Sequence, residues 1–169
     1  MKDNILLTPH FKLREFTESA TAMKHGIDNR PTPEVVENLK HLCQHTLEPL
    51  REKLGLPIII TSGFRTKELN DIIVHASRKS QHISGQAADF WVSGFKFQVS
   101  SPESHRELLT RAFRLIITDP EVDFDKIIIY PTFIHVSFVS PSANRHSIME
   151  AKGDGKYKSL TRADALSLV

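Results

Sequence analysis

The sequence has little cysteine and no long apolar segment. Cys43 is the single cysteine in 169 residues, which excludes an internal disulfide framework and a zinc site built from several thiolates. The longest uninterrupted apolar runs are only a few residues, too short for a membrane-spanning helix, so we expect no membrane insertion. The first ten residues also lack the apolar stretch of a signal peptide, which predicts a chain that is cytoplasmic as synthesised.

The chain also lacks a large excess of either positive or negative charge. The chain has 22 Lys and Arg against 20 Asp and Glu, a formal net charge of +2, and no run of basic residues longer than two. This balance argues against a nucleic-acid partner or binding to an anionic membrane. What stands out instead is nine histidines, where we expect the chemistry to lie. The length predicts one domain spanning residues 1–169, which we expect to be a monomer.

Hydrophobic periodicity predicts an α+β fold, with helices early in the chain and antiparallel strands late. Phe11, Leu13, Phe16 and Met23 are expected to anchor an irregular first segment. The predicted helices cover Pro33–Leu54 (capped by Thr32 and kinked at Pro49), Leu69–Ala76 and Pro102–Ile117 (capped by Ser101). The predicted strands cover Ile58–Thr61, Ala87–Val92, Phe124–Tyr130 and Phe133–Val139, the last two forming a hairpin. The polar tail after Pro141 gives no clear pattern.

Two histidines and one aspartate form the most informative group. His82 and Asp89 are seven residues apart, about 10 Å along a single helix, which is too far for one metal ion. A turn at Gly85 followed by a strand would instead fold the imidazole back beside the carboxylate. His135 lies on a later strand, on the face opposite to the apolar Ile134. Two imidazoles and a carboxylate suit zinc and leave a fourth position for water.

The spacing alone leaves other interpretations open. His135 could be a hydrogen-bonded structural residue, and Asp89 could satisfy a buried turn. His41 and His45 are one helical turn apart, a spacing that can bind zinc, but no third ligand lies near them in the sequence. The other histidines are predicted to lie on the surface: His10, His25, His75, His105 and His146.

Several motifs in order resemble the zinc peptidases of the M15 family. This family includes D-Ala-D-Ala carboxypeptidases, vancomycin-resistance dipeptidases and phage L-alanyl-D-glutamate endolysins. The resemblance extends from about residue 11 to residue 145 and implies a hedgehog/DD-peptidase fold, an antiparallel sheet with helices packed on it. The motifs are Phe11–Phe16, Leu47–Arg51, Thr61–Arg65, Asn70, Ser80–His82, Gly85–Asp89 and Ile134–Ser137.

Carried over by position, the resemblance implies that His82, Asp89 and His135 bind zinc (Zn2+). Arg65 would hold a substrate carboxylate or a polarised carbonyl, with a structural pairing to a nearby acid as the alternative. Ser80 and Gln81 would line the cleft, where they orient His82, bind substrate or simply form a turn. The implied reaction is hydrolysis of an amide bond in a peptidoglycan stem peptide, of the D,D-carboxypeptidase or the L-Ala-D-Glu endopeptidase type.

The sequence departs from the family pattern at the general base. Members of the family usually carry an acid shortly before the last histidine, but Tyr130 stands there in this chain. A phenol with a pKa of about 10 is a poor base at neutral pH, although it can donate a hydrogen bond. Asp125 is about 17 Å of strand away. The segment Val74-His75-Ala76 also replaces a glycine pair, which predicts a less sharp turn.

The missing acid raises an alternative function: a non-catalytic zinc-binding module, either cell-wall-binding or phage-derived. A metal-free interaction domain of the same fold is a third possibility. As the chain shows no export signal, two settings are consistent with an enzyme that acts on peptidoglycan: a prophage-encoded lysis enzyme that is released to the cell wall by phage-type lysis, and a cytoplasmic recycling enzyme.

Overall fold

A computed structural model describes residues 5–74, 76–94 and 105–168. The fold is α+β, as predicted, and its main feature is a six-stranded sheet in the order β3-β4-β6-β5-β7-β8. The strands are β3 (Ile58–Ser62), β4 (Ala87–Val92), β5 (Lys126–Ile129), β6 (Ile134–Ser137), β7 (Ser147–Ala151) and β8 (Tyr157–Leu160). A separate two-stranded sheet joins β1 (Leu6–Thr8) to β2 (Phe11–Lys12).

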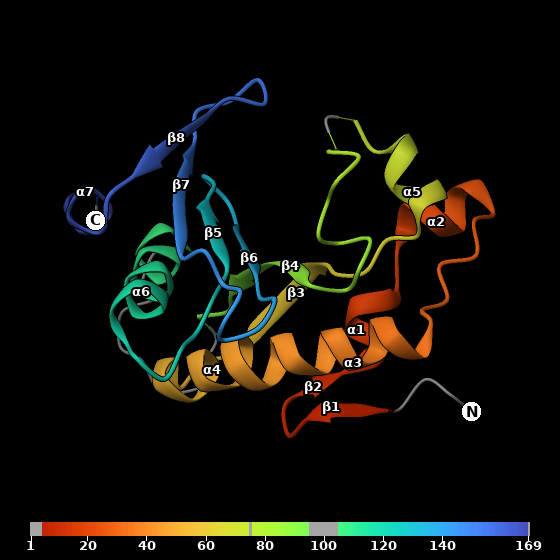
Figure 1. Cartoon of the computed structure of the whole chain (residues 1–169), viewed down its shortest axis with the longest axis horizontal. Coiled ribbons are helices and arrows are strands. Elements are labelled where there is room, and N and C mark those ends of the chain that lie inside the picture. The colour runs from red at the N-terminus through yellow and green to blue at the C-terminus, as the bar shows by residue number, and fades with distance from the viewer. Residues whose placement is uncertain (1–4, 75, 95–104, 169) are drawn as a thin grey trace.

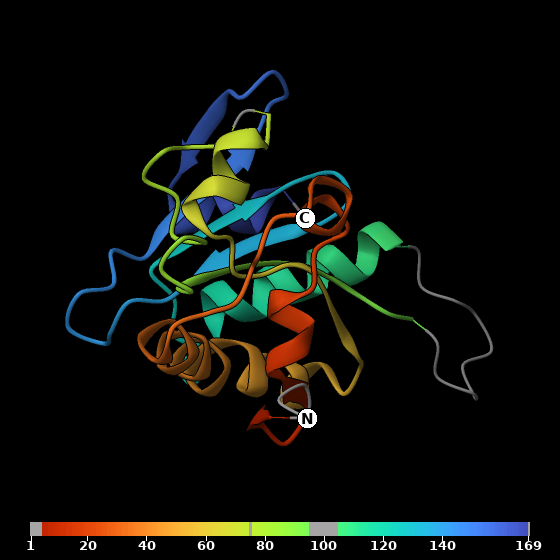
Figure 2. The same ribbon diagram turned by 90° about the vertical axis from the view of Figure 1, so that its right-hand side faces the viewer.

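Helices cover one side of the sheet and leave the other side open over its middle strands (Figure 1). None of the described helices has the length and apolarity needed to cross a bilayer. They are α1 (Leu13–Thr17), α2 (Ala20–His25), α3 (Pro33–Leu42), the π-helical segment η1 (Cys43–Leu47), α4 (Glu48–Leu54), α5 (Lys67–Ile72), α6 (His105–Thr118) and α7 (Arg162–Ser167). The helices α3, α4 and α6 lie on one side, and α5 lies on the other (Figures 1 and 2).

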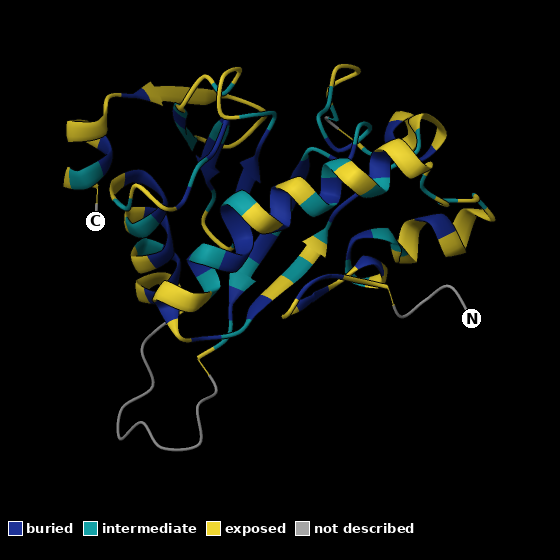
Figure 3. Ribbon diagram, turned by 60° about the horizontal axis from the view of Figure 1, so that its bottom comes forward, coloured by how far each residue is buried: buried dark blue, intermediate teal, exposed yellow. Residues whose placement is uncertain are grey.

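Alternation along the strands separates the apolar core from the open face. Phe90 pairs with Ile134 across β4 and β6, and both are fully buried on the helix-covered side. Asp89 and His135 form the next pair and belong to the opposite face. Along α3 the buried residues Val35, Leu39 and Leu42 share one side, while exposed residues face outward (Figure 3).

The predicted disturbance at Pro49 is present as a π-helical segment just before it. Pro49 has no N–H with which to reach the carbonyl of His45, four residues earlier. That carbonyl instead accepts a hydrogen bond of 2.9 Å from the N–H of Asp123, and Thr46 Oγ1 donates to the Asp123 carbonyl at 2.5 Å. Because Pro49 cannot donate to it, the carbonyl of His45 is free to accept from Asp123, and this hydrogen bond connects the helix to the segment before β5.

Two expectations about the helices need correction, and a third is not tested. The helix α5 begins at Lys67, because Thr66 Oγ1 accepts from the N–H of Leu69, and it ends at Ile72 rather than at residue 76. Met23 was expected to be an anchor but is 79% exposed. The predicted cap of α6, Ser101, lies outside the described residues.

The tail that gave no clear pattern completes the sheet. The strand β7 pairs with β5 in parallel, the one parallel pair among the described strands, and β8 returns antiparallel to it. The N–H of Ser147 donates to the carbonyl of Asp125 at 2.9 Å, which fixes where β7 begins. Ile148, Leu160 and Ala165 from this tail join the buried core.

Gly63, directly after β3, provides a test of this packing. A Cβ at this position would lie 2.5 Å from both Cα and the carbonyl oxygen of Phe16, and backbone atoms cannot move aside cheaply. We expect Gly63→Ala to lower the free energy of unfolding by about 3 kcal/mol in urea denaturation. As a control, Gly153→Ala meets no atom within 4 Å and should cost only the strain of its positive φ, about 1–2 kcal/mol. An equal loss in both variants would contradict the close packing of Gly63.

Candidate metal centre

Strand register brings Asp89 and His135 together on the open face of the sheet. Asp89 on β4 lies directly opposite His135 on β6, and His135 lies opposite Ile128 on β5. His82 comes from the loop before β4, which folds back because Gly85 adopts φ +70° against α3. A Cβ at Gly85 would meet the carbonyl oxygen of Val35 at 2.7 Å. The turn expected at Gly85 is therefore present, and it places the imidazole of His82 beside the carboxylate.

Three side-chain atoms converge closely enough to share one metal ion. His82 Nε2 lies 3.3 Å from His135 Nδ1 and 3.4 Å from Asp89 Oδ1, and His135 Nδ1 lies 2.8 Å from Asp89 Oδ1. Ligands bound at 2.0–2.1 Å around a tetrahedral zinc ion are about 3.3 Å apart, close to these separations. Among the described residues, this is the group of His, Cys, Asp and Glu whose ligand atoms meet in this way.

The protein orients both imidazoles. His82 is buried and its Nδ1 lies 2.6 Å from the carbonyl of Gly63, which assigns the proton to Nδ1 and leaves Nε2 free to bind a metal. His135 is buried with Nδ1 toward the other two side chains, while its Nε2 has no partner among the described residues. Burial lowers the pKa of His135 in spite of the neighbouring carboxylate, which favours the neutral, metal-binding form.

Asp89 is held in its ionised form. Burial alone would raise the pKa of Asp89, but the two imidazoles beside it outweigh that effect and lower the pKa well below its ordinary value. At neutral pH the group therefore offers two nitrogen donors and one carboxylate, which is a donor set that zinc prefers.

Arg65 uses Asp89 as its partner. Its Nη2 donates to Asp89 Oδ2 at 3.1 Å and its Nε donates to Ser62 Oγ at 3.1 Å, with the side chain only 13% exposed. The acid that pairs with Arg65 is therefore Asp89, whereas Asp71, an acid nearer in the sequence, lies 2.8 Å from Lys67. Since Asp89 Oδ1 faces the imidazoles, the carboxylate links the guanidinium to the candidate metal centre.

Ser80 and Gln81 hold the loop that carries His82. Ser80 Oγ accepts from the N–H of His82 at 3.4 Å, and Gln81 Nε2 donates to Asp125 Oδ2 at 2.9 Å. Both residues are half-buried and line the cleft around the centre. These contacts support the expected turn and orienting roles, while binding of substrate by either residue stays a prediction.

Tyr130 follows β5 and lies at the edge of the same cleft. Its hydroxyl is 3.1 Å from that of Tyr157, and its ring stacks on Phe133 with centroids 4.2 Å apart. Burial, followed by the hydrogen bond with Tyr157, raises the pKa of Tyr130 well above its ordinary value. The phenol therefore stays protonated at neutral pH and can act as a hydrogen-bond donor, not as a base.

The family model for Peptidase M15 matches residues 9–108, more than half of the chain. The chain belongs to the Peptidase M15 family. The matched region includes Arg65, His82 and Asp89, while Tyr130 and His135 lie beyond it. No curated protein matches the chain.

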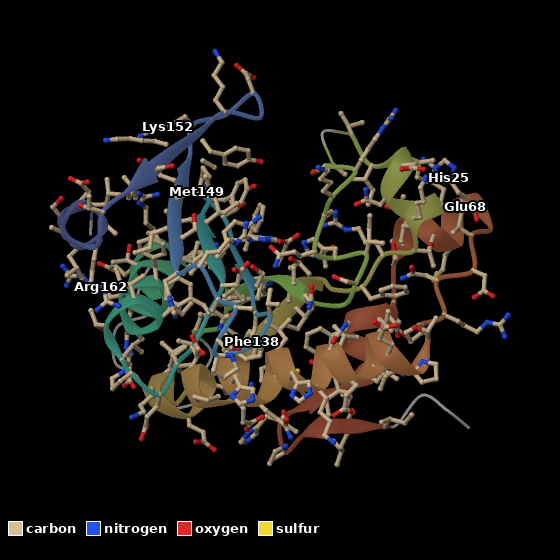
Figure 4. All side chains as sticks on the ribbon, in the orientation of Figure 1. His25, Glu68, Phe138, Met149, Lys152 and Arg162 are labelled. Atoms are coloured by element: carbon tan, nitrogen blue, oxygen red, sulfur yellow. The ribbon has the colours of Figure 1, made fainter. Side chains whose placement is uncertain are left out.

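The cleft of this M15 family member has a volume of about 560 Å³ and runs between two projecting segments. One wall is formed by residues 73–74 and 76–81 after α5, and the other by the turn between β7 and β8 (Figure 1). Lys152 marks the start of that turn in Figure 4. Asp89 and Asp154 are the carboxylates among the described lining residues. Asp154 belongs to the β7–β8 turn, and β7 is two strand spacings, about 10 Å, from β6 and His135.

The buried carboxylate of Asp125 helps to hold the candidate metal centre of this M15 chain in place. In the sequence, Asp125 was considered only as a general base and was expected to lie too far away. Asp125 is fully buried and accepts from Arg145 Nε at 2.8 Å and from Ser137 Oγ at 3.2 Å, in addition to Gln81. It thereby joins the His82 loop to β6, two residues from His135. Burial would raise the pKa of Asp125, but the hydrogen bonds from Arg145 and Gln81 lower it well below the ordinary range.

The other histidines of this M15 chain lie away from the centre. His45 stacks on Phe138, with centroids 4.7 Å apart, and His41 lies 3.6 Å from a carboxylate oxygen of Glu37. Neither joins a metal-binding group among the residues that the structure describes. The predicted surface positions are confirmed for His10, His25, His105 and His146, which are exposed, whereas His75 and the turn it belongs to lie outside the described residues.

The Asp125 network predicts a pH-dependent loss of stability. We expect Asp125→Asn to lower the free energy of unfolding by about 2–4 kcal/mol at pH 7, because it weakens buried, charge-assisted hydrogen bonds. The pKa of Asp125 is lowered on folding, so its contribution is complete above the unfolded pKa of about 4 and is lost as the pH falls through the folded pKa. The difference between wild type and variant should therefore shrink below about pH 4.

Urea denaturation across pH 2–7 measures this difference, and Asp28→Asn is the control. Asp28 forms an exposed ion pair with Arg30, so its replacement should have a much smaller effect. A loss for Asp125→Asn that equals the control at pH 7 would show that the network does not stabilise the fold.

Proposed function

We propose that this M15 family member is a zinc-dependent metallopeptidase that hydrolyses an amide bond in peptidoglycan stem peptides. The convergence of His82, Asp89 and His135 on the floor of an open cleft carries this proposal. A cleft of about 560 Å³ between two projecting walls suits an extended peptide segment better than a large folded partner. Both bond types remain candidates, the D,D-carboxypeptidase type and the L-Ala-D-Glu endopeptidase type.

His82 Nε2, His135 Nδ1 and a carboxylate oxygen of Asp89 would hold the ion. When bound, zinc lowers the pKa of a coordinated water toward neutrality and polarises an amide carbonyl. Gly63 fixes the tautomer of His82, and the Asp125 network fixes the loop that carries it. These buried hydrogen bonds therefore orient His82 for metal binding before any substrate is bound.

Arg65 and Tyr130 supply donors on one side of the centre. The guanidinium of Arg65 is largely buried and tethered to Asp89 and Ser62, so its remaining N–H groups are fixed in direction. They can donate to a substrate carboxylate or to the negative charge that develops on the carbonyl oxygen. The protonated phenol of Tyr130 can donate to the same charge.

A second candidate function is a zinc-binding module without turnover, either cell-wall-binding or phage-derived. The observation that favours it is that Tyr130, which stands where the resemblance implies an acidic base, stays protonated. For either function we propose a chain that is cytoplasmic as synthesised and reaches the cell wall on phage-type lysis.

Replacing one ligand should separate metal binding from folding. We expect His135→Ala to reduce zinc affinity by more than about 100-fold, measured by competition with a chromogenic chelator, and to abolish stem-peptide cleavage. His25→Ala, an exposed histidine on α2, should bind zinc as wild type does. Unchanged zinc affinity in a folded His135→Ala protein would exclude the site, and zinc binding without cleavage of any stem peptide by wild type would favour the non-catalytic module.

The general base can be tested at Tyr130. If an acid is what this chain lacks, Tyr130→Glu should raise the rate of stem-peptide hydrolysis, by up to the roughly 10²–10⁴-fold typical of a positioned base. Tyr130→Phe should lower kcat modestly, since it removes only a hydrogen-bond donor. An unchanged rate for a zinc-loaded Tyr130→Glu protein would indicate that another group already accepts the proton.

A further inference from the structure

Lys126 places a cation inside the cleft. It is the first residue of β5, half-buried, and it lies opposite Ser137 on β6. Alternation puts its side chain on the same face as Ile128 and His135, and it contributes to the lining of the cleft. Lys126 therefore belongs to the open face. The pair of Lys126 and Ser137 is the neighbour, on that face, of the pair of Ile128 and His135.

This lysine combines partial burial with the lack of a fixed partner. The other two lysines that line the cleft, Lys79 and Lys156, are exposed. Arg65 binds Asp89, and Arg145 binds Asp125. Within the described ranges, no acceptor lies within hydrogen-bond or ion-pair distance of Lys126 Nζ. Burial, followed by the nearby Arg145, lowers the pKa of Lys126, which shows that its ammonium is partly desolvated. A desolvated charge without a partner is costly, and an incoming anion would offset that cost.

The charge of the cleft points to the same kind of ligand. The described lining residues include four cations against two carboxylates, although the whole chain has a formal net charge of only +2. A divalent ion at the centre would add to this surplus. Clefts with a concentrated positive charge favour anionic substrates. The charged lining residues are Arg65, Lys79, Lys126, Lys156, Asp89 and Asp154.

Lys126 and Arg65 lie on different sides of the centre. In the sheet, β3, which leads to Arg65, and β5, which begins at Lys126, lie on opposite sides of β4 and β6. Asp89 and His135 belong to these two middle strands. A peptide bound across the centre would thus meet one cation on each side.

We propose that Lys126 binds a carboxylate of the stem peptide other than the group held by Arg65. An L-Ala-D-Glu segment offers such a carboxylate at its D-Glu residue, beside the backbone amides. This inference rests on the proposed function, and it makes Lys126 a determinant of specificity: peptides in which that carboxylate is amidated should bind less well. The bond is a charge-assisted hydrogen bond from the ammonium to the carboxylate, with no covalent step.

Two synthetic stem peptides that differ only at this group provide the test. One carries the free D-Glu carboxylate and the other its amide, and calorimetry with zinc-loaded protein gives the ratio of the two dissociation constants. We expect wild type to prefer the free acid by about tenfold, the effect of one charge-assisted hydrogen bond. Lys126→Met should reduce the ratio to near one, and Lys126→Arg should retain most of it. Lys24→Met removes the same charge from exposed α2 and should behave as wild type.

Three other results would contradict the proposed role of Lys126. No preference in wild type, an undiminished preference in Lys126→Met, or an equal loss of affinity for both peptides in that variant would overturn the assignment. Where the peptides are cleaved, the ratio of kcat/KM values should follow the ratio of dissociation constants. Where they bind but are not cleaved, the proposed hydrolase activity fails while the binding ratio still decides the role of Lys126.

Discussion

The site depends on the register of β4 against β6. Asp89 lies opposite His135 because these strands pair antiparallel with Phe90 opposite Ile134 in the neighbouring row. A slip of β4 by one residue would turn Asp89 into the helix-covered core, away from His135, and expose Phe90. The burial of that apolar row therefore also fixes where the carboxylate and the imidazole stand, so the stability of the core and the geometry of the centre have the same cause.

The remaining parts of the site are held by backbone and buried polar groups. Gly63 lies so close to α1 that its carbonyl has little freedom, and this carbonyl orients His82. Asp125 ties the His82 loop, through Gln81, to the end of β6 and to the start of β7. The C-terminal tail thus reaches the centre twice, through the network at Asp125 and through the hydroxyl contact of Tyr157 with Tyr130.

Much of this could be predicted from the sequence, because it rests on local patterns. Alternation around His135 and the turn at Gly85 produced the expected local structure, and Pro49, where a kink was expected, follows a π-helical segment. The tail could not be assigned, since β7 and β8 are half-exposed strands whose pairing partners are distant in the chain. The partner of Arg65 and the role of Asp125 were missed for a similar reason: both depend on contacts between elements that spacing does not encode.

The chain is thus a Peptidase M15 family member with a candidate metal centre, and with Tyr130 at the position where the resemblance implies an acid. We propose that one metal ion binds among His82, Asp89 and His135. Anomalous diffraction at the zinc edge, from crystals grown with equimolar zinc, tests it most directly. The account predicts one strong peak within about 2.0–2.2 Å of His82 Nε2, His135 Nδ1 and an Asp89 oxygen. A peak elsewhere, such as at His41 and His45, or no peak at all, would contradict it.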